Sequence, residues 1–208
     1  MRFTDLKRRF RPVTLVAVMP VALTAALVLG VATLAPTASA ETNGKADIRG
    51  AIAHAAITQI GKREQPTNMY PKAYQFRSNI VRPAAWCGVF ANWAWWKGGV
   101  SKRPNMSGSG VNQGHWATYW QKWGKANGRW KPISRHSAAK GDAVVYGTFP
   151  DSVHVGIVVD VRKNSAGKVT KIRSVEGNLS DMVKDTWWRN IGDLSGGGKK
   201  ATGFVSPV

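Results

Sequence analysis

The sequence predicts an α+β domain in which N-terminal helices pack on an antiparallel β-sheet. Apolar residues recur at helical spacing in the part of the chain before residue 130, and they alternate with a period of two beyond Gly141. Successive strands joined by turns, without helices between them, favour an antiparallel sheet. The sequence shows no internal repeat and no low-complexity linker, so we expect a single folded domain.

The first element, residues 1–40, has the composition of a secretory signal peptide. A basic head precedes an uncharged stretch rich in Ala, Val and Leu, and the segment ends in the small residues "ASA". We expect cleavage after Ala40, which leaves residues 41–208 as the mature domain. A retained membrane anchor is the alternative, because the apolar stretch is long enough to span a bilayer. The pair Arg8 and Arg9 also permits twin-arginine export instead of the general secretory route.

The chain is strongly basic even without this segment. Subtracting its five basic and one acidic residues from the totals of 30 and 11 leaves 25 and 10, a formal charge of +15. Such a charge attracts polyanions. Export favours the peptidoglycan and anionic polymers of a bacterial cell wall over nucleic acid. We therefore expect a secreted or wall-associated monomer that binds no nucleic acid and does not insert stably into a membrane. The alternative is that the charge serves solubility alone.

Two helices are expected next. The first spans residues 47–60, with Asp47 as its candidate N-cap and Gly61 as its stop. Its apolar face consists of Ile48, Ile52, Ala55, Ala56 and Ile60. The second spans residues 84–97, follows Pro83 and is apolar nearly all round, so it should be buried at the centre of the fold.

A third, short helix carries an aromatic stripe. Trp116, Tyr119, Trp120 and Trp123 recur at spacings of three and four residues. Packing against a core or a groove demands that spacing by itself, so we favour a structural role. A platform for stacking sugar rings is the alternative.

Four strands are expected beyond Gly141. Residues 142–147, "DAVVYG", and residues 152–161, "SVHVGIVVDV", form the first two. Residues 168–178, "KVTKIRSVEGN", follow a turn and read as the next antiparallel strand. Residues 202–208 are expected to add an edge strand.

Cys87 is the only cysteine in the chain and therefore cannot form an internal disulfide. It is a reactive thiol, an intermolecular partner or an inert buried side chain. In the first turn of its helix, free backbone N–H groups and the helix dipole would stabilise a thiolate. The same N–H groups would also stabilise the oxyanion of a tetrahedral intermediate.

Four histidines are candidate bases for this thiol. His54 lies among alanines, and His115 and His136 lie in loop sequence, so we expect these three to be structural or solvated. His154 starts an otherwise aliphatic strand and faces the side opposite the Val/Ile set, where an unpaired imidazole is costly to bury. Taken alone, His154 would be interpreted as a satisfied core histidine.

Glu176 and Asn178 lie two residues apart, hence on one face if the strand runs through both. A carboxylate there would bind the N–H of His154 and select its tautomer, as the acidic member of a catalytic triad does. Asn178 would do the same or order the loop. The alternatives are an ordinary charge at a strand end and a turn residue. Combined with Cys87 at a helix start, the set indicates an amide-cleaving cysteine, its base and an orienting group.

Four motifs in chain order strengthen this interpretation: "WCGVFANWAW", "KGDAVVYG", "SVHVGIVVDV" and "VEGN". They resemble those of the CHAP domain, the cysteine- and histidine-dependent amidohydrolase/peptidase branch of the papain-like NlpC/P60 superfamily. The first helix, with Asn68 and Tyr70 after it, and the closing "GFVSPV" are similar to secreted bacterial members. The resemblance covers residues 48–205. Gly88 and Val89 depart from it, because they replace a more usual Ala-polar pair.

The resemblance implies a papain-like, NlpC/P60-like single domain. It also implies Cys87 as nucleophile, His154 as general base and acid, Glu176 as orienting residue and Asn178 as a fourth polar member. We expect no cofactor and no metal, because the histidines are scattered and lack a short metal-binding spacing.

The substrate-binding residues are less constrained by the sequence. Trp86, Tyr70, Trp116 and Trp120 are candidates for substrate contact. Relatives often use an upstream Gln or Tyr to assist the oxyanion, and Tyr70 and Gln75 are the candidates for that role. The expected function is hydrolysis of peptidoglycan, as an N-acetylmuramoyl-L-alanine amidase or an endopeptidase, through a thioester. The alternatives are a non-catalytic wall- or glycan-binding module and an exported cysteine peptidase with another substrate.

Overall fold

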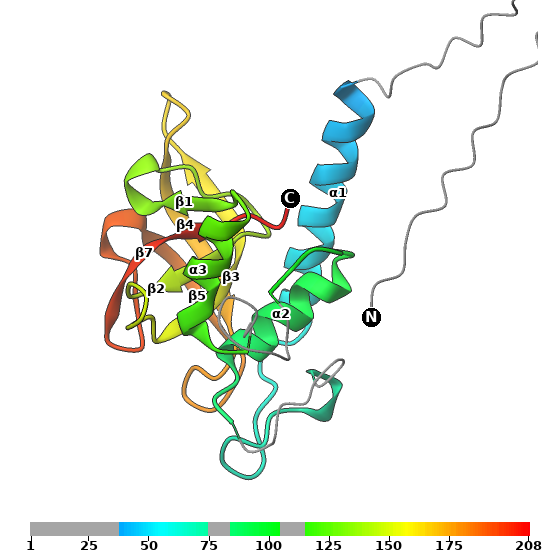
Figure 1. The fold of residues 1–208 in the computed structure, drawn as a ribbon, viewed down its shortest axis with the longest axis vertical. Helices are drawn as coiled ribbons and strands as arrows, with labels where there is room; N and C mark the ends of the chain where they lie inside the picture. The colour runs from blue at the N-terminus through cyan, green and yellow to red at the C-terminus, as the bar shows by residue number, and fades with distance from the viewer. Residues whose placement is uncertain (1–37, 75–83, 105–114) are drawn as a thin grey trace, which may run out of the picture. The chain divides into compact units, whose positions relative to one another are not determined.

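The computed structural model describes residues 38–74, 84–104 and 115–208 (Figure 1). Within these ranges the fold is α+β, as predicted, with helices packed on an antiparallel sheet. Most of the predicted signal peptide lies outside them. In the part of the chain that is described, no helix has both the length and the apolar character needed to cross a membrane.

The three described α-helices precede the strands along the chain. The α-helices are α1 Ala38–Ile57, α2 Cys87–Lys97 and α3 Ala117–Ala126, and the 3-10 helices are Lys72–Tyr74, Ile133–Arg135 and Ile191–Asp193. The strands are β1 Trp130–Pro132, β2 Ala143–Tyr146, β3 His154–Lys163, β4 Val169–Glu176, β5 Lys184–Asn190, β6 Ser195–Gly196 and β7 Lys199–Val205. The sheet order is β1-β7-β2-β3-β4-β5, and β6 pairs with β7. Every pairing is antiparallel.

The closing strand corrects the sequence prediction. β7 was expected at an edge of the sheet, but it lies between β1 and β2 because Val205 pairs with both Trp130 and Ala143. β1 has only three residues and no apolar alternation, so the sequence did not reveal it. β5, the strand at the other end of the order, was missed because none of its residues is fully buried.

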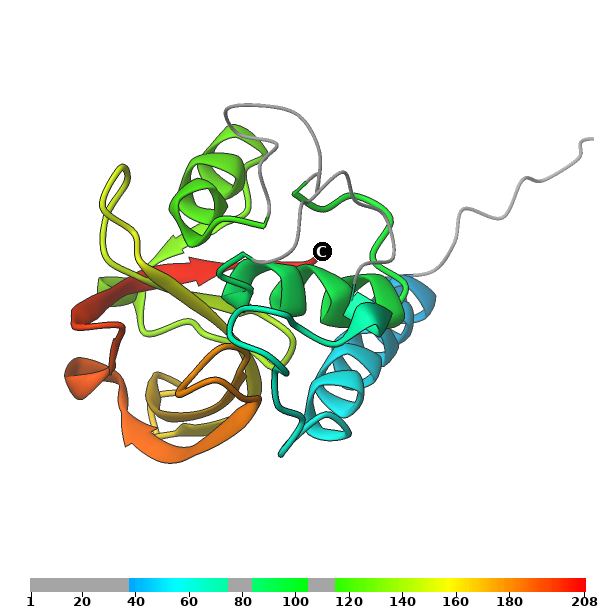
Figure 2. The same ribbon diagram turned by 90° about the horizontal axis from the view of Figure 1, so that it is seen from below.

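α1 differs from the predicted helix at both ends. It begins at Ala38 and ends at Ile57, so Asp47 lies inside the helix and is not its N-cap. Ile52 and Ala56 are buried as expected, whereas Ile60 lies beyond the helix and is 40% exposed. α1 and α2 lie side by side against β3 (Figures 1 and 2).

α2 is the central helix of the larger core. Each of its residues from Cys87 to Trp95 is buried, which confirms the prediction from its apolar composition. The core between the helices and one face of the sheet includes Val155, Ile157 and Val159 of β3. A second cluster on the opposite face includes Val144, Tyr146, Val158, Ile172, Leu194 and Phe204. The alternation of β3 therefore separates two apolar layers.

Candidate active site

Cys87 is the first residue of α2 and is 6% exposed. The preceding Trp86 is fully buried, and its indole N–H donates to Oε2 of Glu64 at 2.6 Å. The other oxygen of Glu64 accepts the backbone N–H of Asn68 at 2.7 Å. This buried carboxylate fixes the residue before the cysteine, so the first turn of α2 has a defined position.

His154 is the first residue of β3, and its imidazole lies between Cys87 and Glu176. Its Nε2 lies 2.9 Å from Oε2 of Glu176. Because an ionised carboxylate only accepts hydrogen bonds, Nε2 carries the proton. The ring also hydrogen-bonds the thiol of Cys87, which leaves Nδ1 as the nitrogen that faces the sulfur. We call Cys87, His154 and Glu176 the relay, and in this order they can act as a nucleophile, a base and an orienting carboxylate.

Glu176 ends β4 and is fully buried. Its Oε2 accepts the hydrogen bond from Nε2 of His154. The other, Oε1, accepts from the hydroxyl of Tyr146 at 2.5 Å, the hydroxyl of Ser174 at 2.8 Å and Nη2 of Arg189 at 2.7 Å. Three donors on one oxygen hold the carboxylate plane in place and leave the second oxygen aimed at the imidazole.

Gly156 makes room for this carboxylate. A Cβ atom at Gly156 would lie 2.4 Å from Cγ of Glu176, closer than two carbon atoms can approach. The missing side chain therefore lets Glu176 lie across β3 toward His154.

The pKa shifts at the site favour a thiolate and imidazolium pair. Burial by itself raises the pKa of Cys87, but the hydrogen bond and positive charge of His154 outweigh burial and lower it. Burial likewise disfavours the charged form of His154, yet its hydrogen bonds to Cys87 and Glu176 raise its pKa. Burial also opposes ionisation of Glu176, whose pKa is lowered by His154, Arg189 and Tyr146.

The backbone around the sulfur supplies further donors. The N–H groups of Gly88 and Val155 hydrogen-bond the sulfur of Cys87 and contribute to its lowered pKa. The first N–H groups of a helix have no partner within the helix. Those at the start of α2 are therefore placed to bind an oxyanion formed beside the sulfur.

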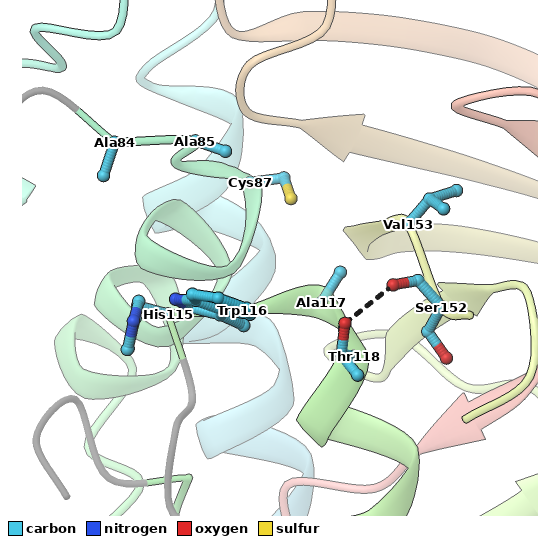
Figure 3. Close-up of a pocket in the computed structure, with 9 residues that line it drawn as sticks. All are labelled: Ala84, Ala85, Cys87, His115, Trp116, Ala117, Thr118, Ser152 and Val153. Carbon is cyan, nitrogen blue, oxygen red and sulfur yellow. Dashed lines mark hydrogen bonds between the residues drawn. The ribbon is translucent and has the colours of Figure 1, made fainter. Parts of the chain in front are cut away.

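A cavity of about 370 Å³ opens beside Cys87 (Figure 3). Apart from Cys87, its walls carry no charged side chain, and they include Ala84, Ala85, Trp116, Ala117, Ser152 and Val153. Thr118 at the start of α3 donates from its hydroxyl to the carbonyl of Ser152 at 3.0 Å. This bond joins one wall of the cavity to the loop that leads into His154.

Three of the four candidate substrate-binding residues are fully buried, namely Trp86, Tyr70 and Trp120. Trp86 is held by Glu64, and Trp120 packs edge-on against Trp95 with ring centroids 4.9 Å apart. Their expected contact with substrate is corrected to a role in packing. Trp116 is 56% exposed and lines the cavity, as a substrate-binding residue would.

Asn178 does not contact the relay of Cys87, His154 and Glu176. β4 ends at Glu176, and Asn178 lies in the following turn with φ 56°, so the strand does not carry both residues on one face. Its side chain makes no hydrogen bond with any described residue, and the prediction of a fourth polar member is corrected to a turn residue. The turn begins at Gly177, where a Cβ would lie 2.5 Å from Cβ of Phe90. Gln75, the other oxyanion candidate, lies outside the described residues.

The residues that support Glu176 were not predicted. Ser174 shares a face with Glu176 at a spacing of two, and Tyr146 pairs with His154 across β2 and β3, so alternation along the strands was the available signal. Arg189 comes from β5, which the sequence did not reveal.

The other histidines lie apart from the relay. His54 is exposed, and Nδ1 of His136 lies 3.0 Å from the carbonyl of Val169. His115 was expected to be solvated, but it is partly buried, lines the cavity and has a pKa lowered by burial. Among the residues described, no three His, Cys, Asp or Glu side chains are grouped so that they could hold a metal ion.

Comparisons with known proteins do not place this chain in a family. No protein family, no curated protein and no solved structure matches it. The likeness to the CHAP domain therefore remains a prediction from the motifs, and the geometry of Cys87, His154 and Glu176 is what defines the site.

Proposed function

We propose that the protein is an exported peptidoglycan hydrolase that cleaves amide bonds of wall peptides with Cys87 as nucleophile. The observation that carries the proposal is the buried relay in which His154 hydrogen-bonds the thiol and its Nε2 lies 2.9 Å from Glu176. A histidine held between a cysteine at a helix start and a carboxylate is the arrangement that nucleophilic amide cleavage requires.

The chemistry proceeds in two halves. The proton of the thiol moves to Nδ1 of His154, and the thiolate attacks the amide carbonyl while backbone N–H groups of α2 stabilise the oxyanion. His154 then gives that proton to the leaving amine as the C–N bond breaks, which leaves a thioester on Cys87. Water attacks the thioester with His154 as base, the C–S bond breaks and the thiol and a carboxylic acid are formed.

Charge and sequence support the wall as the site of action. The chain without residues 1–40 carries a formal charge of +15, which favours binding to anionic wall polymers at low salt. The cavity beside Cys87, with three alanines among its lining residues, suits the small side chains of wall peptides. The signal-like segment and the resemblance to secreted CHAP domains support the same substrate class.

Lysis of purified cell walls by matched variants tests the proposal. We expect Cys87→Ala to abolish the fall in turbidity while the variant still sediments with the walls, because the thiol is needed for cleavage and not for attachment. Unchanged lysis by Cys87→Ala would refute the cysteine mechanism.

Alkylation tests the activation of the thiol without any substrate. Because Cys87 is the only cysteine, iodoacetamide labelling of the whole protein reports on this residue alone. We expect labelling near neutral pH to be faster than that of free cysteine and to slow in His154→Gln. A thiol that reacts no faster than free cysteine would contradict the proposed ion pair.

Mass spectrometry of fragments released from defined wall material distinguishes the remaining possibilities. A free lactyl carboxylate on the sugar identifies an amidase, and a new peptide terminus identifies an endopeptidase. Release from unrelated proteins and not from walls would favour an exported peptidase of another class. A protein that binds walls and releases nothing would be a binding module.

A further inference from the structure

The aromatic stripe of α3 is divided between the core and the surface. Trp120 and Trp123 are 0% and 3% exposed, and both pack against Trp95. Trp116, at the start of the helix, is 56% exposed, and Tyr119 is half-buried. The helical spacing that predicted packing thus describes only half of the stripe.

The surface half continues onto a neighbouring loop. The ring centroids of Trp116 and Tyr119 are 6.5 Å apart, and those of Tyr119 and Phe149 are 6.0 Å apart. Phe149 comes from the loop between β2 and β3 and is 36% exposed. We call Trp116, Tyr119 and Phe149 the aromatic strip. The ammonium of Lys122 lies 4.9 Å from the ring centroid of Phe149, so the far end of the strip carries a positive charge.

The strip is held in place and begins at the catalytic cavity. The backbone N–H of Phe149 donates to Oε1 of Gln121 at 2.7 Å, which fixes the loop on α3. Trp116, at the other end, lines the cavity that contains Cys87 (Figure 3). Aromatic rings ordered before binding lose little entropy when a ligand stacks on them. An exposed row of rings that leads away from a reactive thiol marks a binding surface.

We propose that the aromatic strip binds the sugar chain to which the cleaved peptide is attached. Pyranose rings present apolar C–H faces that stack on aromatic rings, and their hydroxyl and amide groups find donors in Tyr119 and Lys122. The mixture of flat apolar faces and polar edges fits a glycan better than an apolar peptide or a membrane. The assignment rests on the proposed function for its substrate, but the binding it describes does not require catalysis.

Binding of a soluble sugar probe tests the strip directly. The probe is a β-1,4-linked tetramer of N-acetylglucosamine, titrated into the Cys87→Ala protein and followed by indole fluorescence. We expect saturable binding that Trp116→Ala and Phe149→Ala each weaken about tenfold, the loss of one aromatic contact. Trp187→Ala is the matched control, because this tryptophan is 69% exposed on β5, away from the strip, and should not change the affinity.

The outcomes separate this inference from the proposed function. We expect Phe149→Ala in the otherwise native chain to slow cleavage of a sugar-linked peptide about tenfold relative to cleavage of the same peptide without sugar. Sugar binding through the strip, together with a native Cys87 thiol that reacts no faster than free cysteine, would support the strip and refute the hydrolase. Equal affinity of Trp116→Ala and Trp187→Ala for the probe would overturn the strip. So would strip variants that lose binding to phospholipid vesicles and keep binding to the sugar.

Discussion

Replacement of Glu176 by Gln is the sharpest perturbation of the relay. Glu176 accepts from His154 on one oxygen and from three donors on the other. An amide has a single oxygen, so Glu176→Gln must turn an N–H group toward donors on one side. The imidazolium of His154 then loses its charged acceptor, and the ion pair with Cys87 becomes less stable relative to the neutral pair.

The size of the effect follows from the value of one charge-assisted hydrogen bond. Such a bond contributes about 1.5–3 kcal/mol, and one pKa unit corresponds to about 1.4 kcal/mol. We therefore expect Glu176→Gln to lower the pKa of His154 by about 1–2 units. It should reduce the ratio of ion pair to neutral pair about ten- to hundredfold.

The pH profile of iodoacetamide labelling measures this change at the only cysteine. In the native protein we expect fast labelling to extend below the alkaline range of an ordinary thiol, because the pKa of Cys87 is lowered. In Glu176→Gln we expect the fast phase to move toward that alkaline range. Asp185→Asn is the matched control, because Asp185 pairs with Arg173 on the same sheet, Nε to Oδ1 at 3.1 Å, without contacting His154. Overlapping profiles for Glu176→Gln and the native protein, or an equal shift in Asp185→Asn, would refute the relay.

Three further predictions follow from the packing around the site. We expect Gly156→Ala to lower the free energy of unfolding by about 1–3 kcal/mol through overpacking and to slow labelling of Cys87, because the added Cβ displaces Glu176. Urea denaturation measures the stability, and alkylation measures the labelling rate. A loss of stability with an unchanged labelling rate would contradict the displacement of Glu176. Trp86→Phe should lower the free energy of unfolding by about 1–3 kcal/mol in the same assay, since Glu64 loses its indole donor, and an unchanged midpoint would argue against that contact. The lowered pKa of Glu176 means that its charge stabilises the fold above its unfolded pKa of about 4.3, and this contribution is lost as the pH falls through the lower folded value. The gap in unfolding free energy between the native protein and Glu176→Gln should therefore narrow below about pH 4, and a gap that widens in acid would contradict this sign.

The sequence predicted the helices and strands correctly where local interactions determine them. The apolar run of α2 and the alternation of β3 and β4 placed Cys87 at a helix start, and His154 and Glu176 on paired strands. The same reasoning failed for β7, because its position between β1 and β2 depends on pairing with residues far away in the sequence.

The contact of Arg189 with Glu176 could not be predicted from the sequence for a different reason. Its strand, β5, has no fully buried residue, and the strand is interrupted near Trp187, which has φ 54°. Such an irregularity interrupts the alternation of inward and outward side chains, so the sequence shows no period-two pattern for this strand. The cation that neutralises the buried Glu176 therefore lies on a segment whose apolar residues, Trp187 and Trp188, are adjacent and do not alternate.

The glycines of two motifs explain why Cys87, His154 and Glu176 can meet. β3 and β4 run antiparallel with Ile157 opposite Val175, so Gly156 is adjacent to Glu176, and His154 lies one step beyond on the same face. Any side chain at Gly156 would push the carboxylate away from the imidazole. In the second motif, the glycine after Glu176 lets the turn pass against α2, where a Cβ would clash with the ring that follows Cys87 by one helical turn. The "HVG" and "EGN" sequences thus each combine a polar side chain of the relay with a glycine whose missing side chain leaves the space that the packing requires. For this reason they predict the site better than a lone histidine or a lone glutamate does.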